Sequence, residues 1–74
     1  MNTLAYKLNR LNDLYKNKNI IFTFDLSTNN TYRLMLTNKE KCEPYYLNNK
    51  YYKKNDFYVL LDTIYNMVYV FKEN

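Results

Sequence analysis

The sequence predicts one α+β domain over residues 1–74: an antiparallel sheet of three to four strands with an N-terminal and a C-terminal helix packed on one face. Two observations predict it. Apolar residues near both ends of the chain recur at helical spacing, whereas apolar and polar residues alternate through the middle, as they do in half-buried strands. A chain of this length buries only about 60% of its unfolded surface, so we expect one thin core.

The first element is an amphipathic helix over residues 3–16. Its apolar stripe consists of residues at helical spacing: Leu4, Leu8, Leu11 and Tyr15. The opposite face is basic and is predicted to point outward, with Lys7, Arg10 and Lys16 against the single acid Asp13.

A hairpin follows, with strands at residues 20–26 and 31–37 joined by the turn "STNN". One face of it is predicted to enter the core: Phe22, Phe24, Leu34 and Leu36. The other face is mixed and open: Ile21, Thr23, Asp25, Arg33 and Met35.

A second hairpin is predicted from "CEPYYL" and "KYYKK", which flank Asn48-Asn49. Two asparagines can both take positive φ, so a two-residue type I′ turn is available there. That register sets Tyr46 opposite Tyr51 and Tyr45 opposite Tyr52, with one tyrosine pair inward and the other outward. Pro44 lacks a backbone N–H, which favours an edge strand.

The last element is a helix that Asn55 or Asp56 is predicted to cap. Residues 67–71 are β-branched and alternate, which is also typical of a strand. The helix is favoured because the apolar stripe continues unbroken from Phe57. The predicted core of the whole domain is Leu4, Leu8, Leu11, Phe22, Phe24, Leu34, Leu36, Leu60, Leu61, Ile64 and Val68.

The composition excludes several kinds of site. The chain has no glycine, so it has no Gly-rich phosphate loop, and asparagine is expected wherever the backbone needs positive φ. It has no histidine, which removes Ser-His and Cys-His couples and the usual zinc sites. Cys42 is the single cysteine and is predicted to be a half-buried residue at a strand start. Because the carboxylates are scattered, with Asp62 read as a solvated helical position, we expect no enzyme, no metal and no cofactor.

The chain also lacks an apolar run of about 18 residues, so the sequence predicts no membrane span and a cytoplasmic protein of a bacterial host cell. Asn, Lys and Tyr, which have AT-rich codons, are in excess. This bias points to a low-GC bacterium, or to a phage or plasmid living in one. It also offers a simple explanation for part of the tyrosine and lysine content.

Two surfaces are candidates for binding a partner. The first lies around the predicted second hairpin: Tyr46, Lys50, Tyr51, Tyr52, Lys53 and Lys54. The second is a basic cluster around the first helix: Lys7, Arg10, Lys16 and Lys18. Tyrosine gives contact area at low entropic cost, and lysines attract acidic surfaces or phosphates. Lysines also protect an edge strand from aggregation, so a solvated edge is an equally simple interpretation.

The size, the AT-rich composition and the order helix, antiparallel strands, helix resemble those of small phage-encoded inhibitors of bacterial defence, of the anti-CRISPR type. The resemblance implies an inhibitor that binds a host nuclease or its nucleic acid. Many such inhibitors are acidic and imitate DNA, whereas this chain has a net charge of +4, so DNA mimicry is disfavoured.

The function predicted from these features is that of a non-enzymatic binding protein of phage or mobile-element origin. It would inhibit a host nucleic-acid-processing defence system, such as a CRISPR nuclease, by occupying a protein or guide-RNA surface. Its partner would be a host protein or ribonucleoprotein complex. The alternative is a small basic nucleic-acid-binding accessory or regulatory protein. The sequence leaves the oligomeric state open.

Overall fold

The structure is a computed structural model that describes the backbone of residues 3–46 and 48–73, with side chains up to residue 67. Its elements are, in chain order, α1 (Thr3–Leu14), a short 3-10 helix η1 (Lys16–Lys18), β1 (Ile20–Leu26), β2 (Tyr32–Asn38), β3 (Glu43–Tyr46) and α2 (Lys54–Glu73). The strands form one antiparallel sheet in the order β1-β2-β3. The predicted α+β class, with its terminal helices, is confirmed.

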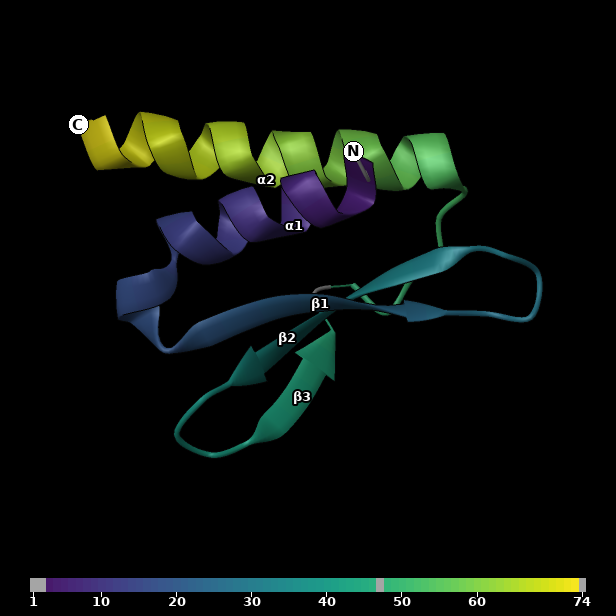
Figure 1. The fold of residues 1–74 in the computed structure, drawn as a ribbon, viewed down its shortest axis with the longest axis horizontal. Coiled ribbons are helices and arrows are strands. Elements are labelled where there is room, and N and C mark those ends of the chain that lie inside the picture. Colours follow the sequence, from purple (N-terminus) through teal and green to yellow (C-terminus); the bar gives the residue numbers. More distant parts are fainter. Residues whose placement is uncertain (1–2, 47, 74) are drawn as a thin grey trace.

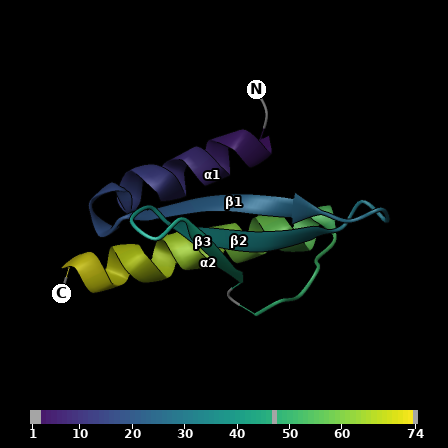
Figure 2. The same cartoon turned by 90° about the horizontal axis from the view of Figure 1, so that it is seen from below.

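Both helices lie on the same side of the sheet, and the opposite face is open (Figure 1). α1 packs over β1 and α2 over β2 (Figure 2), and the two helices also contact each other. The core fills the space between these layers and consists of Leu4, Leu8, Leu11, Phe22, Leu34, Leu36, Phe57 and Leu61. Six of these eight residues come from α1 and the first hairpin, so those elements supply most of the buried surface.

The predicted core needs a correction at the margins. Phe24 is 36% exposed, because it lies on the edge strand β1, where its ring contacts Tyr32 and Phe57 from one side only. Leu60 and Ile64 are half-buried beside the core, and the Val68 side chain lies outside the described residues. Phe57, which begins the apolar stripe of α2, is fully buried.

The first hairpin has the predicted inward and outward faces, and Leu26 lies opposite Tyr32. Phe22 lies opposite Leu36 and buries its side chain with it under the helices, as the alternation requires. Asp25 lies opposite Arg33, so these two residues share the open face. The pairing therefore puts an acid and a base side by side on a face that no helix covers.

Asparagine takes most of the positive φ angles among the described residues, as expected for a chain without glycine. Asn19, Asn30 and Asn49 have φ of 58°, 59° and 53°. The fourth such residue is Cys42, with φ of 55°, in the turn before β3. Cys42 is exposed, so the prediction of a half-buried cysteine at a strand start is wrong; its backbone N–H closes the turn onto the Asn38 carbonyl at 2.7 Å.

α2 begins earlier than predicted, at Lys54, so Asn55 and Asp56 lie inside its first turn and do not precede it as caps. An acid in the first turn still favours the helix, because the N-terminus carries partial positive charge. The helix extends through Glu73, which confirms the helical prediction for residues 67–71.

Candidate functional site

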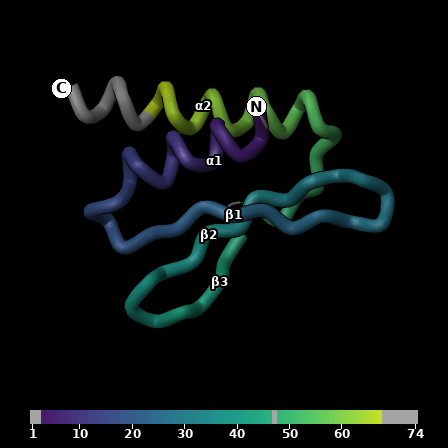
Figure 3. Tube along the Cα trace, in the orientation of Figure 1, coloured from purple at the N-terminus to yellow at the C-terminus, as the bar shows by residue number. Residues whose placement is uncertain are grey.

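The segment after β3 does not fold back as the predicted hairpin. Continuing the register between β2 and β3 would place Asn49 opposite Tyr32, but Tyr52 lies there and exchanges two backbone hydrogen bonds of 2.7 Å with Tyr32. Three extra residues therefore bulge out between Tyr46 and Tyr52. The predicted type I′ turn and its tyrosine pairs are wrong, and Tyr52 replaces the fourth strand with an isolated bridge. Figure 3 follows this irregular stretch from β3 to α2.

The physical reason for the bulge is Arg33, whose side chain gathers the segment onto the open face. Its guanidinium lies 3.7 Å from the centre of the Tyr46 ring and 4.7 Å from that of Tyr51. It donates to the Asn49 side-chain oxygen at 2.7 Å and forms a salt bridge with Asp25. A cation paired with a carboxylate and flanked by two aromatic faces is a strong local attachment point.

We call these five residues the Arg33 cluster: Asp25, Arg33, Tyr46, Asn49 and Tyr51. The hydrogen bond to Asp25 raises the pKa of Arg33 above its usual value, an effect that burial opposes and the nearby tyrosines reinforce. The Tyr51 hydroxyl also donates to Asp25, at 3.3 Å. The cluster thus neutralises its own charge and holds the segment in place.

Beside the Arg33 cluster, residues 50–53 and α2 form a cleft with a volume of about 550 Å³, which we call the lysine cleft. Its lining comes from residues 50–53 and from one side of α2: Lys50, Tyr51, Tyr52, Lys53, Asp56, Val59, Leu60 and Thr63. Four of the six residues predicted to bind a partner line it. Lys54 begins α2 next to the cleft, and Tyr46 lies outside it, over Arg33.

The lysine cleft carries positive charge that the rest of the described chain does not neutralise. No carboxylate within the described residues forms a salt bridge with Lys50, Lys53 or Lys54. Lys50 lies 5.1 Å from the Tyr52 ring centre, and Lys54 lies 6.0 Å from that of Tyr58. The aromatic rings thus position two of the ammonium groups without cancelling their charge.

The second predicted basic surface is divided by the packing of α1 against α2. Lys7 and Arg10 do not face outward but bind the carboxylate of Asp62 in α2, at 2.7 and 2.8 Å. Asp62 therefore joins the two helices and is not the simple solvated residue that the sequence suggested. Lys16 lies 3.8 Å from Asp13 at the far end of α1, and Lys18 is exposed in η1. Lys7 and Arg10 are thus already engaged in structure.

Two further observations concern the kind of chemistry available. Among the described residues, no three His, Cys, Asp or Glu side chains are grouped so that they could hold a metal ion. No described helix is long and apolar enough to cross a membrane. The arrangement of the lysine cleft, with free cations, aromatic rings and an exposed Val59, suits the binding of an acidic surface.

Comparisons with family models, with curated proteins and with solved structures find no match to this chain. The geometry therefore carries the functional argument. The Arg33 cluster was not predicted as a unit, although one signal was present: Asp25 and Arg33 were both predicted on the open face of the first hairpin, and the structure pairs them. The contribution of residues 49 and 51 had no sequence signal, because it depends on a bulge that no local turn motif encodes.

Proposed function

We propose that this chain is a non-enzymatic binding protein whose lysine cleft docks on an acidic surface of a protein partner. The observation that carries the proposal is the contrast in charge pairing. Arg33, Arg10 and Lys7 each form a salt bridge within the fold, whereas Lys50 and Lys53, which line the cleft, and Lys54, which begins α2 beside it, form no ion pair among the described residues. Unpaired charges around a cleft attract a partner of opposite sign and accelerate its association.

A protein partner is favoured over nucleic acid by the state of the tyrosines. Arg33 lies over one face of the Tyr51 ring and Lys50 lies over the Tyr52 ring, so each ring already has a face in contact with a cation of the chain, which leaves less of it for stacking on bases. The cleft also contains the apolar side chain of Val59, which is 63% exposed and which a phosphate backbone would not complement. A patch of acids beside an apolar side chain complements this lining.

The class of target comes from the resemblance to phage-encoded inhibitors of bacterial defence. On this proposal the chain is of phage or mobile-element origin and occupies an acidic surface of a host nucleic-acid-processing complex, such as a CRISPR nuclease. Inhibition then needs no chemistry of its own, because an occupied surface is closed to substrate. The small size of the domain suits such a role, in which one face binds and the rest supports it.

The test compares two triple variants of equal net charge. Lys50→Gln, Lys53→Gln and Lys54→Gln together remove the charge of the cleft, while Lys18→Gln, Lys39→Gln and Lys41→Gln remove three exposed charges elsewhere. Each variant and the wild type are immobilised and incubated with a nuclease-treated lysate of a low-GC bacterium that carries a CRISPR system. The same proteins are expressed in that host and scored for rescue of a phage that the system targets.

We expect the cleft variant to lose both the captured nuclease complex and the phage rescue, with binding at low salt weakened by about tenfold or more. The control variant should behave like the wild type. Equal losses in both variants would show that only net charge matters, and would overturn the proposal. Capture that disappears with nuclease treatment, accompanied by binding of the wild type to RNA or DNA oligonucleotides, would identify a nucleic-acid-binding protein instead.

A further inference from the structure

The outer edge of β1 presents backbone groups that β2 does not use. Asn12 bonds both the N–H and the C=O of Phe22, so the backbone groups of Phe22 point away from β2. Every second residue of a strand points its backbone groups the same way, so those of Phe24 and Leu26 also face outward. The pairing of Tyr32 agrees with this direction. Tyr32 lies opposite Leu26, but its backbone N–H and C=O bond Tyr52, on the side of β2 away from β1.

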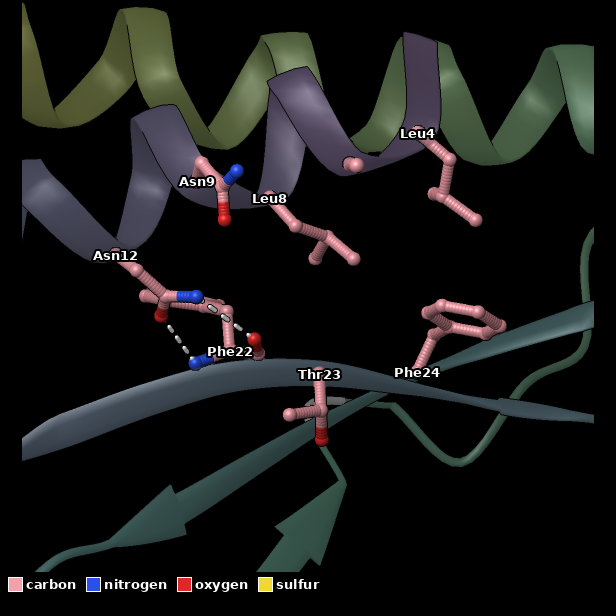
Figure 4. Close-up of a pocket in the computed structure, with 8 residues that line it drawn as sticks. Leu4, Leu8, Asn9, Asn12, Phe22, Thr23 and Phe24 are labelled. Carbon is pink, nitrogen blue, oxygen red and sulfur yellow. Dashed lines mark hydrogen bonds between the residues drawn. The ribbon is translucent and has the colours of Figure 1, made fainter. Parts of the chain in front are cut away.

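Asn12 acts at this edge as a substitute for one residue of a neighbouring strand. Its side-chain oxygen accepts from Phe22 N–H at 2.6 Å, and its side-chain nitrogen donates to the Phe22 carbonyl at 3.0 Å (Figure 4). The amide group thus makes the two bonds that an antiparallel neighbour would make. No hydrogen bond within the described parts of the chain serves Phe24 or Leu26 on this side. The N–H and C=O groups of Phe24 and Leu26 are therefore available for hydrogen bonding along the outer edge of β1, next to the position of Phe22 that Asn12 occupies.

Directly above this stretch, α1 and β1 enclose a groove of about 370 Å³. Its lining is uncharged and mostly apolar: Leu4, Ala5, Leu8, Asn9, Asn12, Phe22, Thr23 and Phe24. Figure 4 shows Leu4, Leu8 and Phe24 projecting into the space between the helix and the strand, while Thr23 points to the other face of the sheet. The partial exposure of Phe24, at 36%, results from this opening.

We propose that the edge of β1 binds an extended segment of a partner protein as an added strand, with uncharged apolar side chains at every second position. The backbone of the segment would bond Phe24 and Leu26, and alternate side chains would enter the groove under α1. The electrostatics of the groove select this occupant, since a charged side chain would lose its water there without gaining a partner. The site is independent of the proposed function, because the lysine cleft lies at the other edge of the sheet.

A second copy of this chain fits the edge less well. If two β1 strands paired antiparallel through Phe24 and Leu26 of each copy, their Asp25 residues would meet at the symmetry axis. Like charges directly opposite each other destabilise a strand pair, and the salt bridge of each Asp25 with its own Arg33 would offset only part of this repulsion. Extending the contact toward Phe22 would require Asn12 to release both of its bonds. A heterologous segment meets neither obstacle.

The test uses a synthetic peptide, acetylated and amidated at its ends, with the sequence Lys-Thr-Val-Thr-Val-Thr-Lys. Its binding to the full chain is followed by amide chemical shifts and by amide hydrogen exchange. We expect saturable shifts and slower exchange at Phe24 and Leu26, whose amides gain partners. Thr23 and Asp25, which already bond β2, should gain no protection. A control peptide that is N-methylated at the positions facing β1 should not bind, because it lacks the donors.

Two variants on the exposed surface of α1 make the test specific to the groove. Ala5→Phe fills the groove and should weaken peptide binding by about tenfold or more. Asp13→Phe adds the same ring to the same helix away from the groove and should leave the affinity unchanged. Equal binding of the N-methylated peptide, or equal affinity in Ala5→Phe, would overturn the proposal. So would self-association of the free chain, measured by light scattering, if it protects Phe24 and Leu26 without peptide.

Discussion

The two arginines of this chain have almost the same surroundings but different structural duties. Arg10 pairs with Asp62 and lies over the rings of Tyr6 and Tyr65, at 5.5 and 3.9 Å. Arg33 pairs with Asp25 and lies over the rings of Tyr46 and Tyr51. Arg10 joins two helices, whereas Arg33 joins a strand to an irregular segment. Guanidinium suits both places because its planar group can pair with a carboxylate and stack at the same time.

The difference lies in what else holds the partners. α1 and α2 are already fixed by the buried side chains of Leu8, Leu11 and Leu61, and Lys7 pairs with Asp62 as well. The segment at residues 48–51 contributes no buried residue, so the Arg33 cluster and the Tyr52 bridge are its main attachments. Similar arginine contacts therefore add little to the attachment of α1 to α2, but they supply much of the attachment of residues 48–51 to the sheet.

The largest expected effect on stability comes from a substitution on the core face of β2, opposite to the face that carries Arg33. Leu34 follows Arg33 in the strand but points to the core, where it is 2% exposed. Replacing it with Ala should lower the free energy of unfolding by about 2–5 kcal/mol, because a cavity remains between the sheet and α2. The free energy of unfolding of a small domain is little larger than this loss, so the contacts of Arg10 and those of the Arg33 cluster should be lost together. Urea unfolding followed by circular dichroism measures the change, and an unchanged midpoint would contradict the core assignment.

A smaller and local effect is expected from Arg33→Met, which keeps the length of the side chain but removes its charge and donors. The segment at residues 48–51 should detach while the first hairpin persists. Hydrogen exchange should become faster by about tenfold or more at the Tyr52 amide, because local opening becomes easier. The amide of Thr23, within the hairpin, should change little. Unaltered exchange at Tyr52 would show that the bridge to Tyr32 holds the segment without Arg33.

The smallest effect is expected from Arg10→Met, the matched variant at the other arginine. Lys7 keeps Asp62 paired, and the helices keep their apolar contact, so the free energy of unfolding should fall by less than about 1 kcal/mol. Exchange at Tyr52 should match that of the wild type. Thermal unfolding and the same exchange experiment measure both quantities. A loss as large as that of Leu34→Ala would mean that charge, more than apolar packing, holds the helices together.

Sequence patterns predicted the elements whose structure depends on local periodicity. The spacing of Leu4, Leu8 and Leu11 predicted α1, and the alternation from residue 20 to residue 37 predicted a hairpin with the inward and outward faces that are found. Such patterns succeed because one buried face fixes both the type of element and the direction of its side chains. The face of Phe24 was assigned correctly, but its exposure was not, because periodicity does not show that β1 ends the sheet.

The errors have a common physical cause, which is contact between residues distant in sequence. Asn48-Asn49 favours a tight turn locally, but Asn49 contacts Arg33 of β2, and a bulge forms instead of the turn. Lys7 and Arg10 look like a solvated basic face until α2 brings Asp62 against them. The candidate site was predicted in part: Lys50 and Lys53 line one cleft, but the α2 side of that cleft followed only from the packing of the helices.

The placement of the two helices at opposite ends of the chain also has a consequence for biosynthesis. α1 leaves the ribosome before α2, and at about 5–20 residues per second the start of α2 follows roughly 3–10 s later. Until α2 is synthesised, Leu4, Leu8 and Leu11 lack the Leu61 side chain with which they share the core. Completion of the core therefore depends on α2, and the apolar stripe of α1 stays partly uncovered until α2 is in place.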